Sequence, residues 1–199
     1  MNYRDRIISY IRSQAKPPDK FSHQARLFEL AKKLAGDQAF DEDVLFAAAW
    51  MHDLGVFIGH RPEDPVALAK WDNVAYAIEK TPAILTDLGF PQQKIPAVIE
   101  AIRTHLPSAT PTSFEATLLR DADILEQLGA VGMLRIVSKT GRDTRFIRFT
   151  DAIRALQRNV TELPPLLKLA SAQTEARARI RILEAFLEAA KAEAMGHEM

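Results

Sequence analysis

The sequence predicts an all-α protein, because apolar residues recur at helical spacing along most of its 199 residues and no stretch shows sustained alternation. Hydrophobic residues make up 47% of the chain, enough for a packed core, and charged residues make up 26%, which suits a solvated surface. There is no internal repeat and no low-complexity segment. We therefore expect a single domain spanning residues 1–199.

Helical periodicity and turn signals divide the chain into expected elements. The helices are expected at about residues 4–14, 21–35, 43–55, 71–80, 82–88, 92–105, 112–137 and 171–194. Residues 56–68 contain Gly59, Pro62 and Pro65 and are expected to form a loop. Thr112 and Glu115 have the spacing of a capping box at the start of their helix.

Two of these helices carry the residues of interest. In residues 21–35, His23 begins a stripe of apolar residues at helical spacing, and Gly36 stands where a C-terminal cap belongs. The helix over 43–55 is apolar almost all round, so we expect it at the centre of the fold. Asp41 or Asp43 is expected to cap its start.

Composition excludes several classes of protein and of site. Lys and Arg together number 26, as do Asp and Glu, which argues against binding nucleic acid or membranes through bulk charge. The absence of cysteine excludes disulfides, zinc–thiolate sites and thiol nucleophiles, so a metal would be held by His and carboxylate groups. With no signal peptide and no apolar run near 18 residues, we expect a cytoplasmic protein.

The dipeptide His52-Asp53 ends an otherwise apolar helix, where polar groups are costly to bury without a partner. Consecutive helical residues point about 100° apart, so both side chains can converge on an ion beyond the helix end. A hydrogen-bonded His–Asp pair without metal is the simpler alternative. His23 on its apolar stripe could likewise be an ordinary core histidine.

In chain order, His23, His52-Asp53 and the segment Asp121-Ala122-Asp123 resemble the H…HD…D pattern of the HD superfamily of metal-dependent phosphohydrolases. The resemblance covers about residues 20–135, and the tail is similar to that of small single-domain bacterial members. It implies an HD-type helical bundle with a metal-binding core at about 20–135 and a C-terminal helical extension at about 150–195. It also implies one divalent metal ion, whose identity the residues do not select.

The fourth ligand is a choice between two aspartates of one helix. Periodicity favours Asp121, which falls on one stripe with Leu118 and Leu125. The family pattern favours Asp123, because its ligand follows a small residue and precedes a leucine by two positions. The resemblance therefore implies His23, His52, Asp53 and Asp123 as ligands, with Asp121 in a supporting catalytic role or as a substitute.

Dinuclear branches of the superfamily carry extra histidines between the HD pair and the final aspartate. His105 matches the later one, but Asp72 stands near the earlier position, so we expect one metal. His60 is interpreted as a loop residue. The implied mechanism is hydrolytic, with a metal-activated water and with Asp53, Asp121 or His105 moving its proton.

A small phosphorylated substrate, such as a phosphomonoester or nucleotide, needs cationic partners. Arg26, Arg61, Arg142 and Arg145 are the candidate substrate-binding residues, since the planar guanidinium suits phosphate oxygens. Trp50 and Trp71 are interpreted as core residues rather than base-stacking ones. The alternatives left open are a hydratase or oxygenase on the same fold, and a non-enzymatic helical sensor. The long C-terminal helix packs on its own domain or on a second copy in a homodimer.

Overall fold

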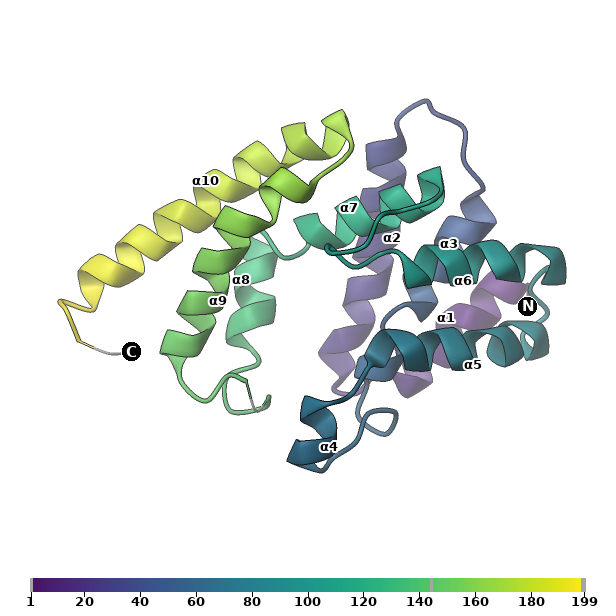
Figure 1. Ribbon diagram of the computed structural model, residues 1–199, viewed down its shortest axis with the longest axis horizontal. Coiled ribbons are helices and arrows are strands. Elements are labelled where there is room, and N and C mark those ends of the chain that lie inside the picture. The colour runs from purple at the N-terminus through teal and green to yellow at the C-terminus, as the bar shows by residue number, and fades with distance from the viewer. Residues whose placement is uncertain (1, 144, 198–199) are drawn as a thin grey trace. The chain divides into compact units, whose positions relative to one another are not determined.

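The computed structural model describes residues 2–143 and 145–197. In this described part the chain forms ten α-helices, four short 3-10 helices and no β-strand, which confirms the predicted all-α fold (Figure 1). The chain divides into two compact units, Met1–Arg120 and Asp121–Met199. The single domain expected from the sequence stays a prediction.

The first unit contains seven helices, the last of which continues into the second unit. They are α1 (Tyr3–Gln14), α2 (Phe21–Ala35), α3 (Glu42–Met51), α4 (Pro65–Ala69), α5 (Asn73–Asp87), α6 (Ile95–Arg103) and α7 (Phe114–Leu125). Three 3-10 helices, η1 (Pro18–Lys20), η2 (Leu54–Val56) and η3 (Gln92–Lys94), link them.

Helix α3 is the centre of this unit, as its sequence predicts. Every residue from 44 to 51 is buried, and α1, α2 and α6 pack against the helix (Figure 1). The apolar stripe of α2 is buried too, with His23 only 4% exposed and Leu27 fully buried. Gly36 ends α2 at a φ of +56°, a conformation that suits glycine. The two expected inner helices are therefore confirmed.

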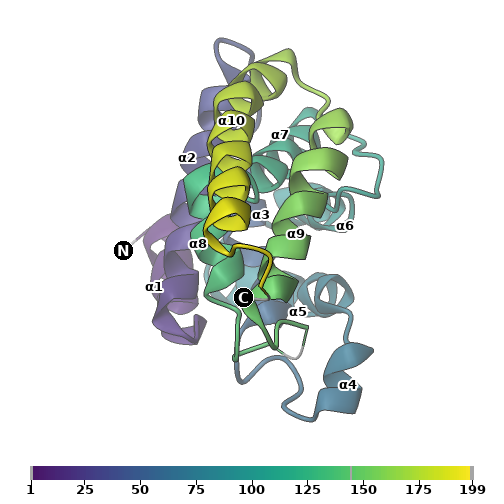
Figure 2. The same ribbon diagram turned by 90° about the vertical axis from the view of Figure 1, so that its left-hand side faces the viewer.

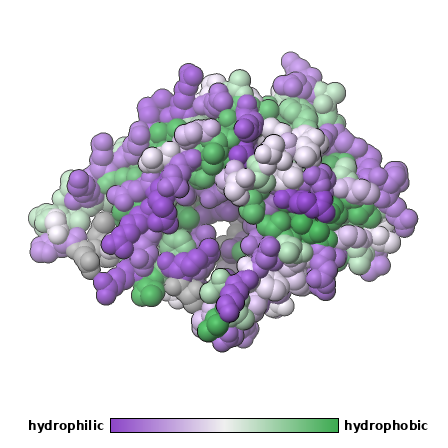
Figure 3. Space-filling model, in the orientation of Figure 1, coloured by the Kyte–Doolittle hydropathy of each residue, from purple (hydrophilic) through white to green (hydrophobic). Residues whose placement is uncertain are grey.

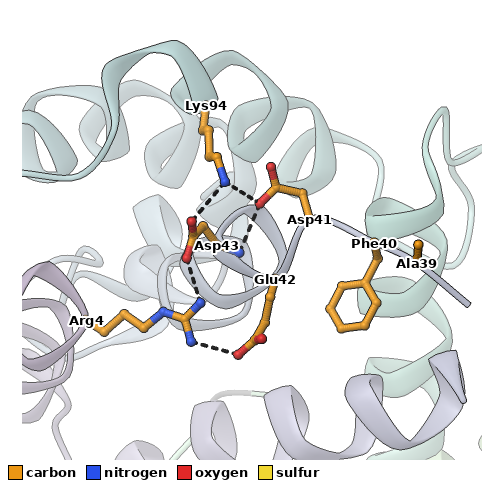
Figure 4. A pocket seen from close by; sticks show the side chains of 7 residues that line it. All are labelled: Arg4, Ala39, Phe40, Asp41, Glu42, Asp43 and Lys94. Carbon is orange, nitrogen blue, oxygen red and sulfur yellow. Dashed lines mark hydrogen bonds and ion pairs between the residues drawn. The ribbon is translucent and has the colours of Figure 1, made fainter. Parts of the chain in front are cut away.

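Ion pairs fasten the N-terminal end of α3 to its neighbours, where they line a shallow pocket (Figure 4). Asp41 caps the helix by accepting hydrogen bonds from the amides of residues 43 and 44. The carboxylate of Asp43 accepts hydrogen bonds from Tyr3 and Arg4 of α1 and from Lys94. One helix end thus joins α1 to the segment before α6.

Several expected boundaries are wrong, each for a local reason. The loop over 56–68 contains α4, which Asp64 caps and Pro65 begins. Pro82 does not divide 71–88, because α5 buries Ala77, Thr81 and Leu85 along one face and continues through it.

The helix expected over 112–137 is two helices. Gly129 adopts a φ of +70°, which α-helical backbone excludes, so α8 (Gly129–Val137) starts a new direction there. The capping box is also wrong. Ser113 caps α7 by accepting the amide of Ala116, and Glu115 instead accepts the backbone amide of Asp41.

The second unit contains α8, α9 (Phe149–Glu162), η4 (Pro164–Leu166) and α10 (Ala170–Glu193). Helices α8, α9 and α10 pack on one another (Figure 2) around buried Ile136, Leu156 and Leu183. From the sequence, α9 is expected only as part of a helical extension. Asp121 fastens the start of α10, since its Oδ2 accepts the backbone amides of Lys168 and Leu169 at 2.9 and 2.8 Å.

Hydrophilic side chains dominate the face of the molecule shown in Figure 3, with hydrophobic patches between them. Among the described residues, no helix combines the length and the apolar character needed to cross a membrane.

The Asp43 cluster predicts an acid-dependent stability. Burial would raise the pKa of the Asp43 carboxyl, but hydrogen bonds from Tyr3, Arg4 and Lys94 outweigh burial and lower it. A group whose folded pKa lies below its unfolded value of about 3.9 stabilises the protein above that pH. Its contribution is lost as the pH falls toward the folded pKa. We expect Asp43→Asn to cost about 1–3 kcal/mol at pH 7 and less at pH 3, measured by urea unfolding.

The matched control is Asp87→Asn, which changes an exposed carboxylate at the end of α5. Its unfolding free energy should follow that of the unaltered protein at both pH values. An Asp43→Asn deficit that stayed constant between pH 7 and pH 3 would contradict the assigned role of the carboxylate.

Candidate metal centre

Three side chains from two helices and a turn converge in the first unit. His23 lies on the buried stripe of α2, His52 is the C-terminal cap of α3, and Asp53 follows it. The Nε2 atoms of His23 and His52 each lie 3.6 Å from a carboxylate oxygen of Asp53. One ligand atom from each residue lies within 4.8 Å of the others. The convergence expected of these three residues is therefore present.

The end of α3 sets the direction of both HD side chains. The helix stops at Met51 rather than at Gly55, and Asp53 leaves helical geometry with φ −96° and ψ 12°. The chain then forms η2, in which Leu54 and Gly55 are buried. Because the backbone turns at Asp53, its carboxylate faces the imidazoles of both histidines instead of continuing around α3.

A hydrogen bond to the backbone of α3 fixes the orientation of the His52 ring. Its Nδ1 lies 3.0 Å from the carbonyl oxygen of Ala49, so Nδ1–H donates and Nε2 faces Asp53. A second hydrogen bond of this kind commonly fixes the tautomer of a metal-binding histidine. The side chain of His52 is 1% exposed, whereas that of Asp53 is 19% exposed. The centre is thus shielded on the histidine side and reachable on the carboxylate side.

His105 lies beside this group without belonging to it. Its ring centroid is 5.1 Å from that of His52, which in turn is 5.4 Å from that of His23. Nδ1 of His105 faces the carbonyl oxygen of Ile102 at 2.6 Å, and within the part of the chain that the structure describes its Nε2 makes no hydrogen bond. A buried imidazole with one nitrogen available next to the centre suits proton transfer.

His60 and Asp72 have other partners. Nε2–H of His60 donates to Oε1 of Gln14 at 2.9 Å, its Nδ1 accepts from the hydroxyl of Tyr76 at 3.0 Å, and burial lowers its pKa. Asp72 caps α5 by accepting the amides of Val74 and Ala75. Sequence reasoning missed Gln14 and Tyr76, because Gln14 is 46 residues from His60 and no local pattern joins them.

The candidate substrate-binding arginines divide between the units. In the first unit, Arg26 is half-buried and donates to Ser22, one turn before it. Arg61 is half-buried, and its guanidinium forms no hydrogen bond or ion pair with another described residue. In the second unit, Arg145 is exposed and forms a two-point pair with Asp143, while Arg142 is exposed in the same loop.

The two aspartates of α7 have different environments. Asp121 is fully buried, and its carboxylate receives the two backbone amides that begin α10. Asp123 is half-buried. These observations describe the second unit alone, so the fourth ligand remains a prediction.

The pocket at the start of α3 is not this centre. It is lined by Arg4, Asp43 and Lys94, at the opposite end of the helix from His52. A ten-residue helix is about 15 Å long, so the two places are far apart. The charged groups of the pocket neutralise one another in ion pairs.

The donor set of the centre fits a divalent ion. Two ligand atoms each about 2.1 Å from one ion, at a tetrahedral angle, lie about 3.4 Å apart, close to the 3.6 Å that separates Asp53 from each histidine nitrogen. Two imidazole nitrogens and a carboxylate oxygen, without sulfur, suit first-row transition metals and, less well, magnesium. The centre is therefore a group of residues that could hold such an ion.

Comparisons with known proteins agree with this architecture. Residues 21–128, 54% of the chain, match the family model described as HD domain. Comparison of the sequence with curated proteins finds no significant match.

Solved structures with the same fold are also found. A predicted HD superfamily hydrolase from an uncultured Thermotogales bacterium is 25% identical, with a TM-score of 0.66. The alignment covers 96% of this chain and 93% of that chain. An HD-superfamily hydrolase from Bacillus thuringiensis is 20% identical, with a TM-score of 0.68 and coverage of 98% and 97%. Bacillus subtilis YpgQ, solved in complex with ADP, is 19% identical, with a TM-score of 0.73 and coverage of 98% and 96%.

The matched segment begins at the first residue of α2 and ends just after α7, so it contains His23, His52, Asp53 and both aspartates. It lies within the range of residues 20–135 over which the sequence resembles the superfamily. The chain belongs to the HD domain family.

Proposed function

We propose that this protein is a metal-dependent phosphohydrolase that acts on a phosphomonoester or a nucleotide. The observation that carries the proposal is the convergence of His23, His52 and Asp53 within 4.8 Å, on the fold of HD-superfamily hydrolases. Such a buried set of two imidazoles and a carboxylate costs folding free energy unless an ion or a reaction uses it.

Each residue has a distinct task in the proposed reaction. His23, His52 and Asp53 would hold a divalent ion, which when bound lowers the pKa of water and neutralises charge on a phosphoryl oxygen. His105, buried with Nε2 available, would accept or return a proton at that nitrogen. The low exposure of the histidines excludes bulk water from one side of the centre.

We propose Asp123 as the fourth ligand and a single ion. Asp121 is buried, and one of its carboxylate oxygens accepts the two backbone amides at the start of α10. This structural role explains a carboxylate at that position. Asp72 acts as a helix cap, and no second cluster of potential ligands is found among the described residues.

Arg61 is the best-supported substrate contact, because its half-buried guanidinium lies in the loop after the HD turn and forms no ion pair with a described residue. Arg145 has Asp143 as its partner and would have to exchange it for a phosphate group. YpgQ binds ADP in its structure, so nucleotides are the first substrates to test.

Phosphate release is the expected activity. Purified protein supplied with Mn²⁺, Mg²⁺, Co²⁺ or Ni²⁺ should release phosphate from a member of a nucleotide and sugar-phosphate panel. Loss of a partner that only supports a ligand weakens metal binding about 10–100-fold, so His52→Ala should reduce activity at least about 100-fold. The matched control is His197→Ala near the C-terminus, which should leave the rate unchanged.

The outcomes separate the alternatives. Consistent absence of released phosphate with metal still bound would favour a hydratase or oxygenase. Absence of metal binding, together with a biological role that survives His52→Ala, would favour a non-enzymatic module.

The number of ions is a separate prediction. After dialysis against excess Mn²⁺ and removal of free ion, elemental analysis should find about one metal per chain. A ratio near two would contradict the single-ion proposal and would point to His105 as a ligand of a second ion.

The choice between the two aspartates can be tested with one substitution at each. Asp123→Asn should empty the centre, because it removes a charged ligand. Asp121→Asn should keep the metal but lower the unfolding free energy of metal-free protein by about 1–3 kcal/mol, since charge-assisted bonds to two amides weaken. Metal analysis and urea unfolding measure both effects. If only the Asp121 change emptied the centre, the assignment would be wrong.

A further inference from the structure

The turn that carries His52 and Asp53 is fastened from outside by the segment that begins α5. The indole Nε1–H of Trp71 donates a hydrogen bond to the carbonyl oxygen of Gly55 at 2.8 Å. Trp71 is half-buried rather than enclosed in the core, where the sequence predicts it to lie. Its indole has one donor, and that N–H bonds to the backbone two residues after Asp53.

Gly55 is also in direct backbone contact with α5. A Cβ atom added at Gly55 would lie 2.6 Å from the carbonyl oxygen of Asn73 and 2.8 Å from its Cα. No side chain fits there, so the HD turn packs on the first residue of α5 without space between them. Asp72 fixes the same point, since it caps α5 through the amides of Val74 and Ala75.

The indole of Trp71 is itself held in place. Its ring centroid lies 5.2 Å from that of Tyr76, whose hydroxyl group pairs with Nδ1 of His60 at 3.0 Å. Nε2 of His60 pairs with Gln14 at the end of α1. A continuous set of contacts therefore joins α1 to the indole, and the indole to the HD turn.

A short stretch of backbone joins Gly55, which Trp71 holds, to the candidate ligand Asp53. The amide of Val56 donates to the carbonyl oxygen of Asp53 at 2.9 Å, and Leu54 between them is fully buried. A shift of Gly55 must therefore move Asp53. A ligand displaced by a few tenths of an ångström loses affinity, because ligand-to-metal distances vary by only about 0.2 Å.

We propose that Trp71 is a positioning residue for the metal centre, and that its indole N–H holds the HD turn in the geometry that binds the ion. This inference rests on the proposed function in one respect, that His23, His52 and Asp53 bind a divalent metal. Trp71 does not touch the ion or the substrate. It acts through Gly55, and we expect its loss to weaken metal binding as the loss of a partner bonded directly to a ligand does, by about 10–100-fold.

The sharpest test removes the donor and keeps the shape. Benzothienylalanine, in which sulfur replaces the indole N–H, is incorporated at position 71 and, in a separate protein, at position 50. Trp50 is the matched control because it is 4% exposed and its Nε1 makes no hydrogen bond with any described residue. The dissociation constant for Mn²⁺ alone is measured by calorimetry, and thermal unfolding is measured in EDTA.

We expect the replacement at position 71 to weaken Mn²⁺ binding about 10-fold or more, with an unfolding midpoint in EDTA close to that of the control. Replacement at position 50 should leave the affinity within error. An unchanged affinity at position 71 would overturn the inference. A lower midpoint in EDTA with unchanged affinity would show a purely structural bond and would overturn it too.

Gly55→Ala tests the same turn by another route. The added methyl group meets Asn73 backbone, which cannot move aside, so the turn must shift and Mn²⁺ binding should weaken in protein that still unfolds cooperatively in EDTA. Folded Gly55→Ala protein with unaltered affinity would count against the inference. If the unaltered protein bound no metal, the proposed function would fail along with the inference. Metal binding that does not depend on the Trp71 indole N–H would contradict the inference alone.

Discussion

The burial of α3 on every side is the constraint on which the first unit depends. Since residues 44–51 are all enclosed, the helix has no polar face through which it could be held in place. Its position is set by packing along its length and by polar contacts at its two ends. At one end Asp41 and Asp43 join α1 to the segment before α6, and at the other the HD turn meets α2 and α5. An apolar rod fixed at both ends holds His52 at a defined distance from His23.

The same constraint explains why the HD pair stands where it does. A polar residue inside α3 would be buried without water, which costs free energy unless a partner compensates. Only beyond Met51, where the backbone leaves the helix, can a carboxylate reach both imidazoles and remain partly exposed. The position of the candidate metal centre is therefore a consequence of where the apolar run ends. The 19% exposure of Asp53 leaves the carboxylate side of the centre reachable from solvent.

Sequence periodicity predicts what is local and apolar, and it fails where distant polar contacts decide. The all-α fold, the buried stripe of α2 and the central α3 follow from residue spacing alone. By contrast, Pro82 does not end a helix, because the buried face of α5 outweighs one missing hydrogen bond. Glu115 lies three residues after Thr112 as a capping box requires, yet it accepts the amide of Asp41, 74 residues away. His60 has a loop position and two distant partners. Of the candidate centre, the three convergent residues were predictable, but the support from Trp71 was not.

The disagreement between periodicity and family pattern at Asp121 and Asp123 has a physical explanation. Residues two apart in a helix point about 200° apart, so the two carboxylates of α7 cannot serve one place. Periodicity selects Asp121 because it detects burial, and Asp121 is indeed fully buried, with Lys168 and Leu169 amides satisfying it. A metal ligand has a different requirement, since the lone pairs of its carboxylate oxygens must face the ion rather than backbone amides. Burial at helical spacing therefore identifies the residue that fastens α10, which is a structural role distinct from the one that the family pattern assigns to Asp123.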